Sequence, residues 1–122
     1  MINHFERNKL IRDRNMGIAV GDGVTVCLYS DQHACTVIKR TKTTMIVQRD
    51  KATLSEDFQP EFEIGGFLAH CTNNGQQEYT YEADPNGQTY KCHWSEKYGC
   101  WRTGNGSIEV IPGRHEFYDY NF

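Results

Sequence analysis

Three close pairs of cysteine and histidine are the first residues in this chain whose types suit metal binding. The pairs are His33 and Cys35, His70 and Cys71, and Cys92 and His93. Adjacent strand residues point to opposite faces, so Cys92 and His93 cannot share one ion on a regular strand, whereas His33 and Cys35 could. Structural zinc needs four nitrogen or sulfur ligands, and no Cys-x-x-Cys spacing is present. We therefore expect no metal site and predict that the small buried thiols are Cys27, Cys92 and Cys100.

Catalytic motifs occur only as fragments. His115 and Glu116 begin a zinc-protease motif, but Asp119 occupies the position of its second histidine. Cys71 lies beside His70 in an irregular polar stretch, which makes it the best candidate for an exposed thiol nucleophile. An enzyme therefore stays a lesser alternative. We expect no catalytic residue and a function based on binding.

A run of basic residues gives a stronger functional indication. Five cations lie on both limbs and at the tip of one predicted hairpin: Lys39, Arg40, Lys42, Arg49 and Lys51. Arginine binds phosphate through two parallel hydrogen bonds and lysine binds it as a point charge, so Arg40, Arg49 and Lys42 are the predicted phosphate ligands. The residues predicted to stack on a base are Tyr29, His93 and Trp94. The sequence thus predicts capture of a nucleotide or short nucleic acid, with no further cofactor.

Acidic side chains are concentrated in a different part of the chain. Residues 52–90 contain no lysine or arginine. They contain seven acids: Glu56, Asp57, Glu61, Glu63, Glu78, Glu82 and Asp84. Together with a pI of 5.9, this argues against avid, non-specific binding to duplex nucleic acid. It also supports an alternative function, a protein–protein inhibitor that presents its acidic 52–90 segment to a nucleic-acid-binding protein.

The segments that position these side chains show the period of two that is typical of half-buried strands. The predicted strands are 24–28, 35–40, 45–49, 78–82, 88–94, 98–102, 107–111 and 114–120. Turn sequences separate them, most clearly Asp84-Pro85-Asn86-Gly87, where proline presets φ and Asn-Gly accepts positive φ. The pattern predicts an all-β fold, either a small barrel or a rolled antiparallel sheet of about seven short strands.

Two regions depart from this pattern. Residues 1–16 form an N-terminal arm of net charge +2, whose apolar spacing suits either a short helix or a frayed, flexible tail. Residues 17–122 then form a single β domain. Within it, the stretch 53–74 resembles a long loop excursion, a kind of segment that is often functional in compact domains.

Composition sets the broad class of the protein. The chain has 122 residues, 38% of them hydrophobic, and a net charge of −3, which together indicate one soluble domain. No apolar run approaches the roughly 18–20 residues of a membrane span, and the first residues lack the apolar core of a signal peptide. Five cysteines form an odd set that favours reduced thiols. We expect a cytoplasmic protein without membrane contact, and a homodimer is compatible with its exposed aromatic residues.

Two resemblances add to this interpretation. The opening Gly21-Asp22-Gly23-Val24-Thr25-Val26, followed by a charged hairpin, resembles the start of a small Tudor- or KOW-like barrel. A second likeness covers residues 20–122. It rests on Val20-Gly21-Asp22-Gly23-Val24-Thr25, Val47-Gln48-Arg49-Asp50-Lys51-Ala52, Gly65-Gly66-Phe67, Asp84-Pro85-Asn86-Gly87, His93-Trp94-Ser95-Glu96-Lys97-Tyr98-Gly99 and the ending 113–122. These segments resemble a family of small uncharacterised β-rich proteins of bacteriophages and prophages. The likeness implies host cytoplasm and a role against host defence, and no particular chemistry.

Overall fold

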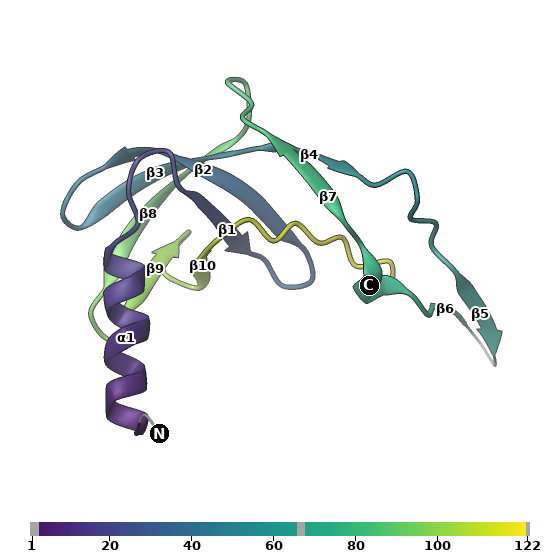
Figure 1. Cartoon of the computed structure of the whole chain (residues 1–122), viewed down its shortest axis with the longest axis horizontal. Helices are drawn as coiled ribbons and strands as arrows, with labels where there is room; N and C mark the ends of the chain where they lie inside the picture. Colours follow the sequence, from purple (N-terminus) through teal and green to yellow (C-terminus); the bar gives the residue numbers. More distant parts are fainter. Residues whose placement is uncertain (1–2, 66–67, 122) are drawn as a thin grey trace.

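A closed barrel of six antiparallel strands forms the centre of the computed structural model, which describes residues 3–65 and 68–121 (Figure 1). The barrel strands are β1 (Gly23–Cys27), β2 (Gln32–Arg40), β3 (Thr44–Arg49), β8 (Thr89–Ser95), β9 (Cys100–Thr103) and β10 (Ile108–Pro112). Each barrel strand pairs with the next, and β10 closes the barrel against β1. The predicted all-β barrel is confirmed. Met1, Ile2, Gly66, Phe67 and Phe122 lie outside the described residues.

The barrel interior is filled by the alternate residues that the sequence pattern selects. Val24 and Val26 of β1 are fully buried, as are Val47 of β3 and Trp101 of β9. Strand residues two apart share a face, so these side chains point into the barrel, although β1 and β9 also bury some of the residues between them. Trp101 fills the space near one end, where the ring of Trp94 meets it edge-on at 5.4 Å between centroids.

An extension interrupts the barrel between β3 and β8. Here β4 (Lys51–Leu54) pairs with β7 (Tyr79–Glu82), and β5 (Phe62–Gly65) pairs with β6 (Leu68–Cys71), followed by a short 3-10 helix, η1 (Asn74–Gln76). We call residues 51–82 the ribbon extension, and it stands away from the barrel on the right of Figure 1. The stretch 53–74 was expected to be a loop excursion, and it does leave the barrel, but it contains β5 and β6.

The turn at 84–87 forms, and the strands beside it do not pair with each other. The amide of Gly87 donates to the carbonyl of Asp84 at 2.9 Å. However, β7 pairs with β4 of the ribbon extension, whereas β8 pairs with β3 of the barrel. The turn sequence therefore predicted the change of direction correctly, while the partner of each strand lies about 25 to 50 positions earlier in the chain.

The last segment is a tail and not the strand predicted at 114–120. Gly113, with a φ of +86°, turns the chain so that the tail crosses from the barrel to the ribbon extension (Figure 1). Within the described residues, its one ladder contact is the antiparallel bridge between Gln32 and Phe117. Further out, the amide and carbonyl of Cys71 both bond to the side chain of Asn121. Side chains, rather than a strand ladder, hold the tail in place.

The N-terminal arm contains the helix α1 (His4–Met16), which resolves the two readings in favour of a short helix. Asn3 caps it by accepting a hydrogen bond from the amide of Glu6 at 2.8 Å. The helix meets the barrel at its C-terminal end, where the buried Asn15 accepts from the indole of Trp101 and donates to the carbonyl of Gly99. Among the described residues, no helix has the length and apolar character needed to cross a membrane.

Candidate functional site

The structure places the predicted phosphate ligands Arg40 and Arg49 at opposite ends of β3. Arg40 pairs with Met45 across the β2–β3 ladder, whereas Arg49 pairs with Cys35. Four residues separate the two positions along the ladder, a distance of about 13 Å at about 3.3 Å per residue. The two arginines therefore do not converge on one phosphate.

Arg40 anchors the helix. Its guanidinium donates from Nη2 to the carbonyl of Met16 and from Nε to the carbonyl of Ile18, both at 2.9 Å. It also lies 4.4 Å from the centroid of the Trp101 ring. These contacts satisfy carbonyls that the end of a helix leaves without intrahelical partners. Lys42, in the β2–β3 turn beside it, is exposed and accepts a hydrogen bond from Arg40 through its own carbonyl.

Arg49 is engaged at the other end of the barrel. Its Nη2 lies 3.3 Å from Oε2 of Glu116, whose side chain is buried. Tyr29 lies in the turn between β1 and β2 and is almost fully exposed. Of the six predicted binding residues, His93 and Trp94 share a pocket.

That pocket, which we call the Tyr98 pocket, is a hollow of about 330 Å³ on the barrel surface at β8 and β9. Its lining combines aromatic and cationic side chains with glycines from the β9–β10 turn: His93, Trp94, Ser95, Lys97, Tyr98, Arg102, Gly104 and Gly106. The volume lies at the lower end of the range of about 300–1,000 Å³ that small-molecule sites occupy. A ligand of the size of one nucleotide unit suits it.

The turn between β8 and β9 fixes the wall of the pocket. Gly99 adopts a φ of +64°, and its amide donates to the carbonyl of Ser95 at 2.8 Å, which reverses the chain. Tyr98, just before it, is consequently held on the surface with its side chain 57% exposed. Arg102 lies over the Tyr98 ring at 4.1 Å, and the Lys97 ammonium lies 5.2 Å from the same centroid. Two cations are thus held at one aromatic ring.

One hydrogen-bond donor of Arg102 has no partner among the described residues. Its Nη1 donates to the carbonyl of Gly106 at 3.2 Å, but its buried Nε has no hydrogen-bond partner among the described residues. A buried donor without a partner carries a desolvation cost, so a shift of the Arg102 side chain that brings this donor to an acceptor would be favourable. Arg102 is therefore the cation in this region that is best prepared to take an acceptor.

The outer face around the pocket is basic. In sequence, β2, β3, β8 and β9 contain no aspartate or glutamate. Lys39 and Lys91 flank Ile46 in one cross-strand row, and both lysines are exposed. In the next row His93 lies between Thr44 and Arg102. Adjacent strands lie about 4.8 Å apart, so Lys39, Lys91 and Arg102 give this face a positive charge that attracts anions, and Glu109 of β10 lies beside Arg102 at its edge.

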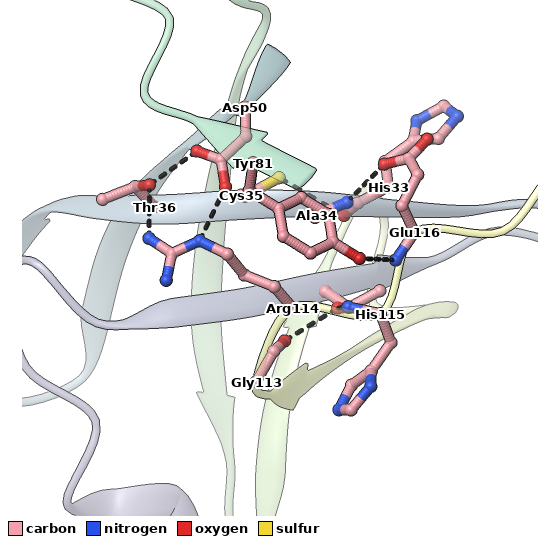
Figure 2. Close-up of polar contacts among 11 residues, drawn as sticks. His33, Ala34, Cys35, Thr36, Asp50, Tyr81, Gly113, Arg114, His115 and Glu116 are labelled. Carbon is pink, nitrogen blue, oxygen red and sulfur yellow. Dashed lines mark hydrogen bonds and ion pairs between the residues drawn. The ribbon is translucent and has the colours of Figure 1, made fainter. Parts of the chain in front are cut away.

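A second group of ionisable residues lies where the tail crosses the barrel, and its two carboxylates are hydrogen-bonded, whereas the buried Nδ1 of His33 has no partner among the described residues (Figure 2). Asp50 accepts from Thr36 at 2.6 Å and from Nε of Arg114 at 2.7 Å. Glu116 accepts from the amide of Ala34 at 2.8 Å, and its own amide donates to the hydroxyl of Tyr81. The network joins the tail, the barrel and the ribbon extension.

The thiol beside that network is poorly suited to chemistry. Burial, with a smaller contribution from the charge of Asp50, raises the pKa of Cys35 to about 12, so it stays protonated. Its Sγ points to the carbonyl of His33 at 3.5 Å. Burial, followed by the nearby charge of Arg49, lowers the pKa of His33 and keeps its ring neutral. We therefore assign this group a structural role.

The expectation of an exposed Cys71 is wrong. Its side chain is buried beneath Asn121, and its Sγ donates to Oδ1 of Asn73 at 3.4 Å. Cys71 and His70 are neighbours on β6, so their side chains point to opposite faces of the hairpin. No nucleophile and base meet there.

Sequence reasoning missed Lys97, Tyr98 and Arg102. Tyr98 was placed at the start of a strand, whereas β9 begins two residues later and leaves Tyr98 in the turn. The available signal was the stretch Lys97-Tyr98-Gly99-Cys100-Trp101-Arg102, in which cations flank aromatic residues around a glycine that permits a tight turn. Searches against protein-family models, curated proteins and solved structures returned no match. Function is therefore inferred from the chain's own geometry.

Proposed function

We propose that this protein is a non-enzymatic binding protein that captures a phosphate-bearing ligand, a nucleotide or short nucleic acid, in the Tyr98 pocket. The observation that carries the proposal is that one hollow brings together aromatic rings and two cations, and that no acidic residue lines it among the described residues. This combination of ring faces and positive charge is typical of sites for single-stranded nucleic acid and its units.

Each lining side chain has a distinct role in this proposal. Arg102, through the Nη donors of its guanidinium, binds the phosphate together with Lys97. The exposed ring of His93 stacks on the base, while Trp94, on the opposite face of β8, packs edge-on against Trp101 and supports the edge of the pocket. Lys91, two residues from His93 on the same face of β8, lies about 7 Å along the strand and binds a further phosphate. Arg40 and Arg49 support the fold and do not contact the ligand.

Titration calorimetry with ATP and with a short single-stranded oligonucleotide tests this proposal. Replacing Arg102 by Met keeps the apolar stem over Tyr98 and removes the charge, so we expect affinity to fall at least tenfold, about 1.4 kcal/mol. Lys51→Met is the matched control, because Lys51 is also an exposed strand cation but lies on the ribbon extension. Failure of all these ligands to bind, or equal binding by Arg102→Met, overturns the proposal.

The likeness to phage and prophage proteins supplies a biological setting for the proposed capture. In the cytoplasm of a host cell, a protein that sequesters a nucleotide or short nucleic acid would blunt a defence or signalling pathway that depends on it. The corresponding experiment is expression in bacteria under phage challenge. We expect the native sequence to improve phage growth on a defended host, and Arg102→Met to lose that effect.

The second candidate function is the protein–protein inhibitor, and the ribbon extension favours it. Six of the seven acids between residues 52 and 90 are exposed, and none of the seven forms a salt bridge in the part of the chain that the structure describes. An extended acidic surface is complementary to the basic face of a nucleic-acid-binding protein of the host.

This candidate predicts a complex that dissociates as salt is raised, because charges at an exposed interface are screened. The test variant replaces four of the acids by glutamine at Glu61, Glu63, Glu78 and Glu82. We expect the variant to lose a basic partner that the native chain retains in a pull-down, and competing DNA to displace that partner from the native chain. Retention of the partner by the four-glutamine variant counts against this function.

A further inference from the structure

A second, larger hollow adjoins the Tyr98 pocket. It has a volume of about 570 Å³ and lies between α1 and the β8–β9 turn, and we call it the helix hollow. Its walls include Phe5 and Ile11 of the helix, with Lys9 between them. The Phe5 side chain is 78% exposed, which leaves a large aromatic ring in contact with water beside a cation. Such a wall offers an apolar contact surface to a ligand in the hollow.

The shape of α1 explains why this wall exists. The helix is held to the barrel near its C-terminal end, through Asn15, through Arg40 and through an ion pair of 2.8 Å between Arg12 and Glu96. Asn15 is the only buried residue of the helix. The N-terminal half therefore projects over the β8–β9 turn and encloses space instead of packing against the barrel.

The two hollows are contiguous because they share two lining residues, Lys97 and Tyr98. Tyr98 is the wall between them, and the Lys97 ammonium lies at the same wall. Neither hollow is lined by an aspartate or glutamate among the described residues. Glu96, the acid of the turn, forms an exposed ion pair with Arg12 and accepts a hydrogen bond from the indole of Trp94 at 3.0 Å. The combined surface thus offers two apolar or aromatic compartments with positive charge where they meet.

We propose that the ligand is a short single-stranded oligonucleotide of at least two nucleotide units, which crosses Tyr98 from one hollow into the other. This inference rests on the proposed function. One base lies in the Tyr98 pocket, the linking phosphate lies at Lys97, and the second base packs on Phe5 in the helix hollow beside Lys9. A mononucleotide fills one compartment and leaves the apolar wall of the other exposed.

The charge pattern favours this occupant over an apolar peptide or a second copy of the chain. A polyanion gains from every cation along the path, namely Lys9, Lys97 and Arg102. Stacking of a second base contributes about 1–3 kcal/mol, so a dinucleotide should bind on the order of tenfold more tightly than the mononucleotide.

The experiment is a length series of thymidylates, a mononucleotide, a dinucleotide and a tetranucleotide, measured by titration calorimetry at fixed salt. We expect the native chain to gain about tenfold in affinity from the first to the second. Phe5→Ala removes this length gain, and Lys9→Gln reduces it. Leu10→Ala is the matched control: Leu10 is also exposed on α1, at 56%, but does not line the hollow, so the gain is retained.

The outcomes separate this inference from the proposal on which it rests. Mononucleotide binding that depends on Arg102, without any gain from the second unit, overturns the inference and leaves the proposed function in place. Absence of binding at every length overturns both. A length gain that survives Phe5→Ala also overturns the inference, because the second base would then lie elsewhere. Far-ultraviolet circular dichroism of each variant checks that α1 is retained.

Discussion

The contact between Arg114 and the buried Asp50 is the point where the structure makes its sharpest prediction about stability. The Asp50 side chain is 1% exposed and is 2.7 Å from Nε of Arg114, while Nη2 of Arg114 also donates to Thr36 at 2.9 Å (Figure 2). Replacing Arg114 by Met keeps the stem and removes both hydrogen bonds. The carboxylate of Asp50 is then left buried with Thr36 as its remaining partner.

The magnitude follows from that geometry. Removing one partner of a buried ion pair costs about 3–5 kcal/mol. The Arg114 side chain is 32% exposed, so water reaches part of the site and the lower value, about 3 kcal/mol, applies. With a urea m-value of about 1.5 kcal/mol/M, the unfolding midpoint should fall by about 2 M. Fluorescence of the fully buried Trp101 reports the transition.

A double variant separates the charge from the packing. The double variant Asp50→Asn with Arg114→Met has no buried charge at this site. We therefore expect it to lose less stability than the sum of the two single losses, by at least about 1.5 kcal/mol. Arg49→Met is the control, because its single contact with Glu116 is longer, at 3.3 Å, and should cost about 1 kcal/mol or less. Additive losses, or a loss of stability below about 0.5 kcal/mol for Arg114→Met, would show that Asp50 does not depend on Arg114.

Three further predictions test other parts of the molecule. Because burial holds the pKa of His33 below its ordinary 6.5, the unfolded chain takes up a proton first as pH falls. The contribution of neutral His33 to the free energy of unfolding is therefore fully present above about pH 6.5 and is lost as pH falls further. His33→Gln should reduce the change in melting temperature between about pH 8 and pH 5, and an unchanged pH dependence contradicts this. Arg40→Met should cost about 2 kcal/mol and reduce helical circular dichroism, since the carbonyls of Met16 and Ile18 lose a charged donor; undiminished helicity would show that α1 is held otherwise. Asn73→Ala removes contacts with Glu61 and Gln59, so amide exchange should accelerate in the ribbon extension and stay slow in the barrel; equal acceleration in both argues against local anchoring.

The barrel could be predicted because its signal is local. Alternation of Val24 and Val26 with polar residues identifies a strand and its buried face without knowledge of the partner strand. Turn sequences such as 84–87 are local in the same sense. The pairing of β7 with β4, instead of with β8, depends on contacts distant in sequence, and the period-two pattern carries no information about them.

The candidate site was harder to predict, for a related reason. Arginines were assigned to phosphate because of their charge, but an arginine also serves wherever backbone carbonyls or a buried carboxylate need a donor. Arg40 serves the end of a helix 24 residues earlier in the chain, and Arg114 serves Asp50. Which cations stay available for a ligand is decided by such tertiary contacts. Arg102 lies between His93 and Glu109 across the ladders, yet among the described residues its Nη1 bonds to the carbonyl of Gly106 and its Nε has no partner.

The position of the ribbon extension reconciles an acidic protein with an anionic ligand. The extension leaves the barrel next to the start of β8, and the Tyr98 pocket lies at the end of that strand. Seven residues of strand span about 20 Å, more than twice the Debye length of about 8 Å at physiological ionic strength. The acids of the extension therefore repel a ligand in the pocket only weakly, while the basic outer face lies close to it. The same separation makes the two proposed functions experimentally independent, because neutralising the acids changes the field at the pocket far less than removing Arg102 does.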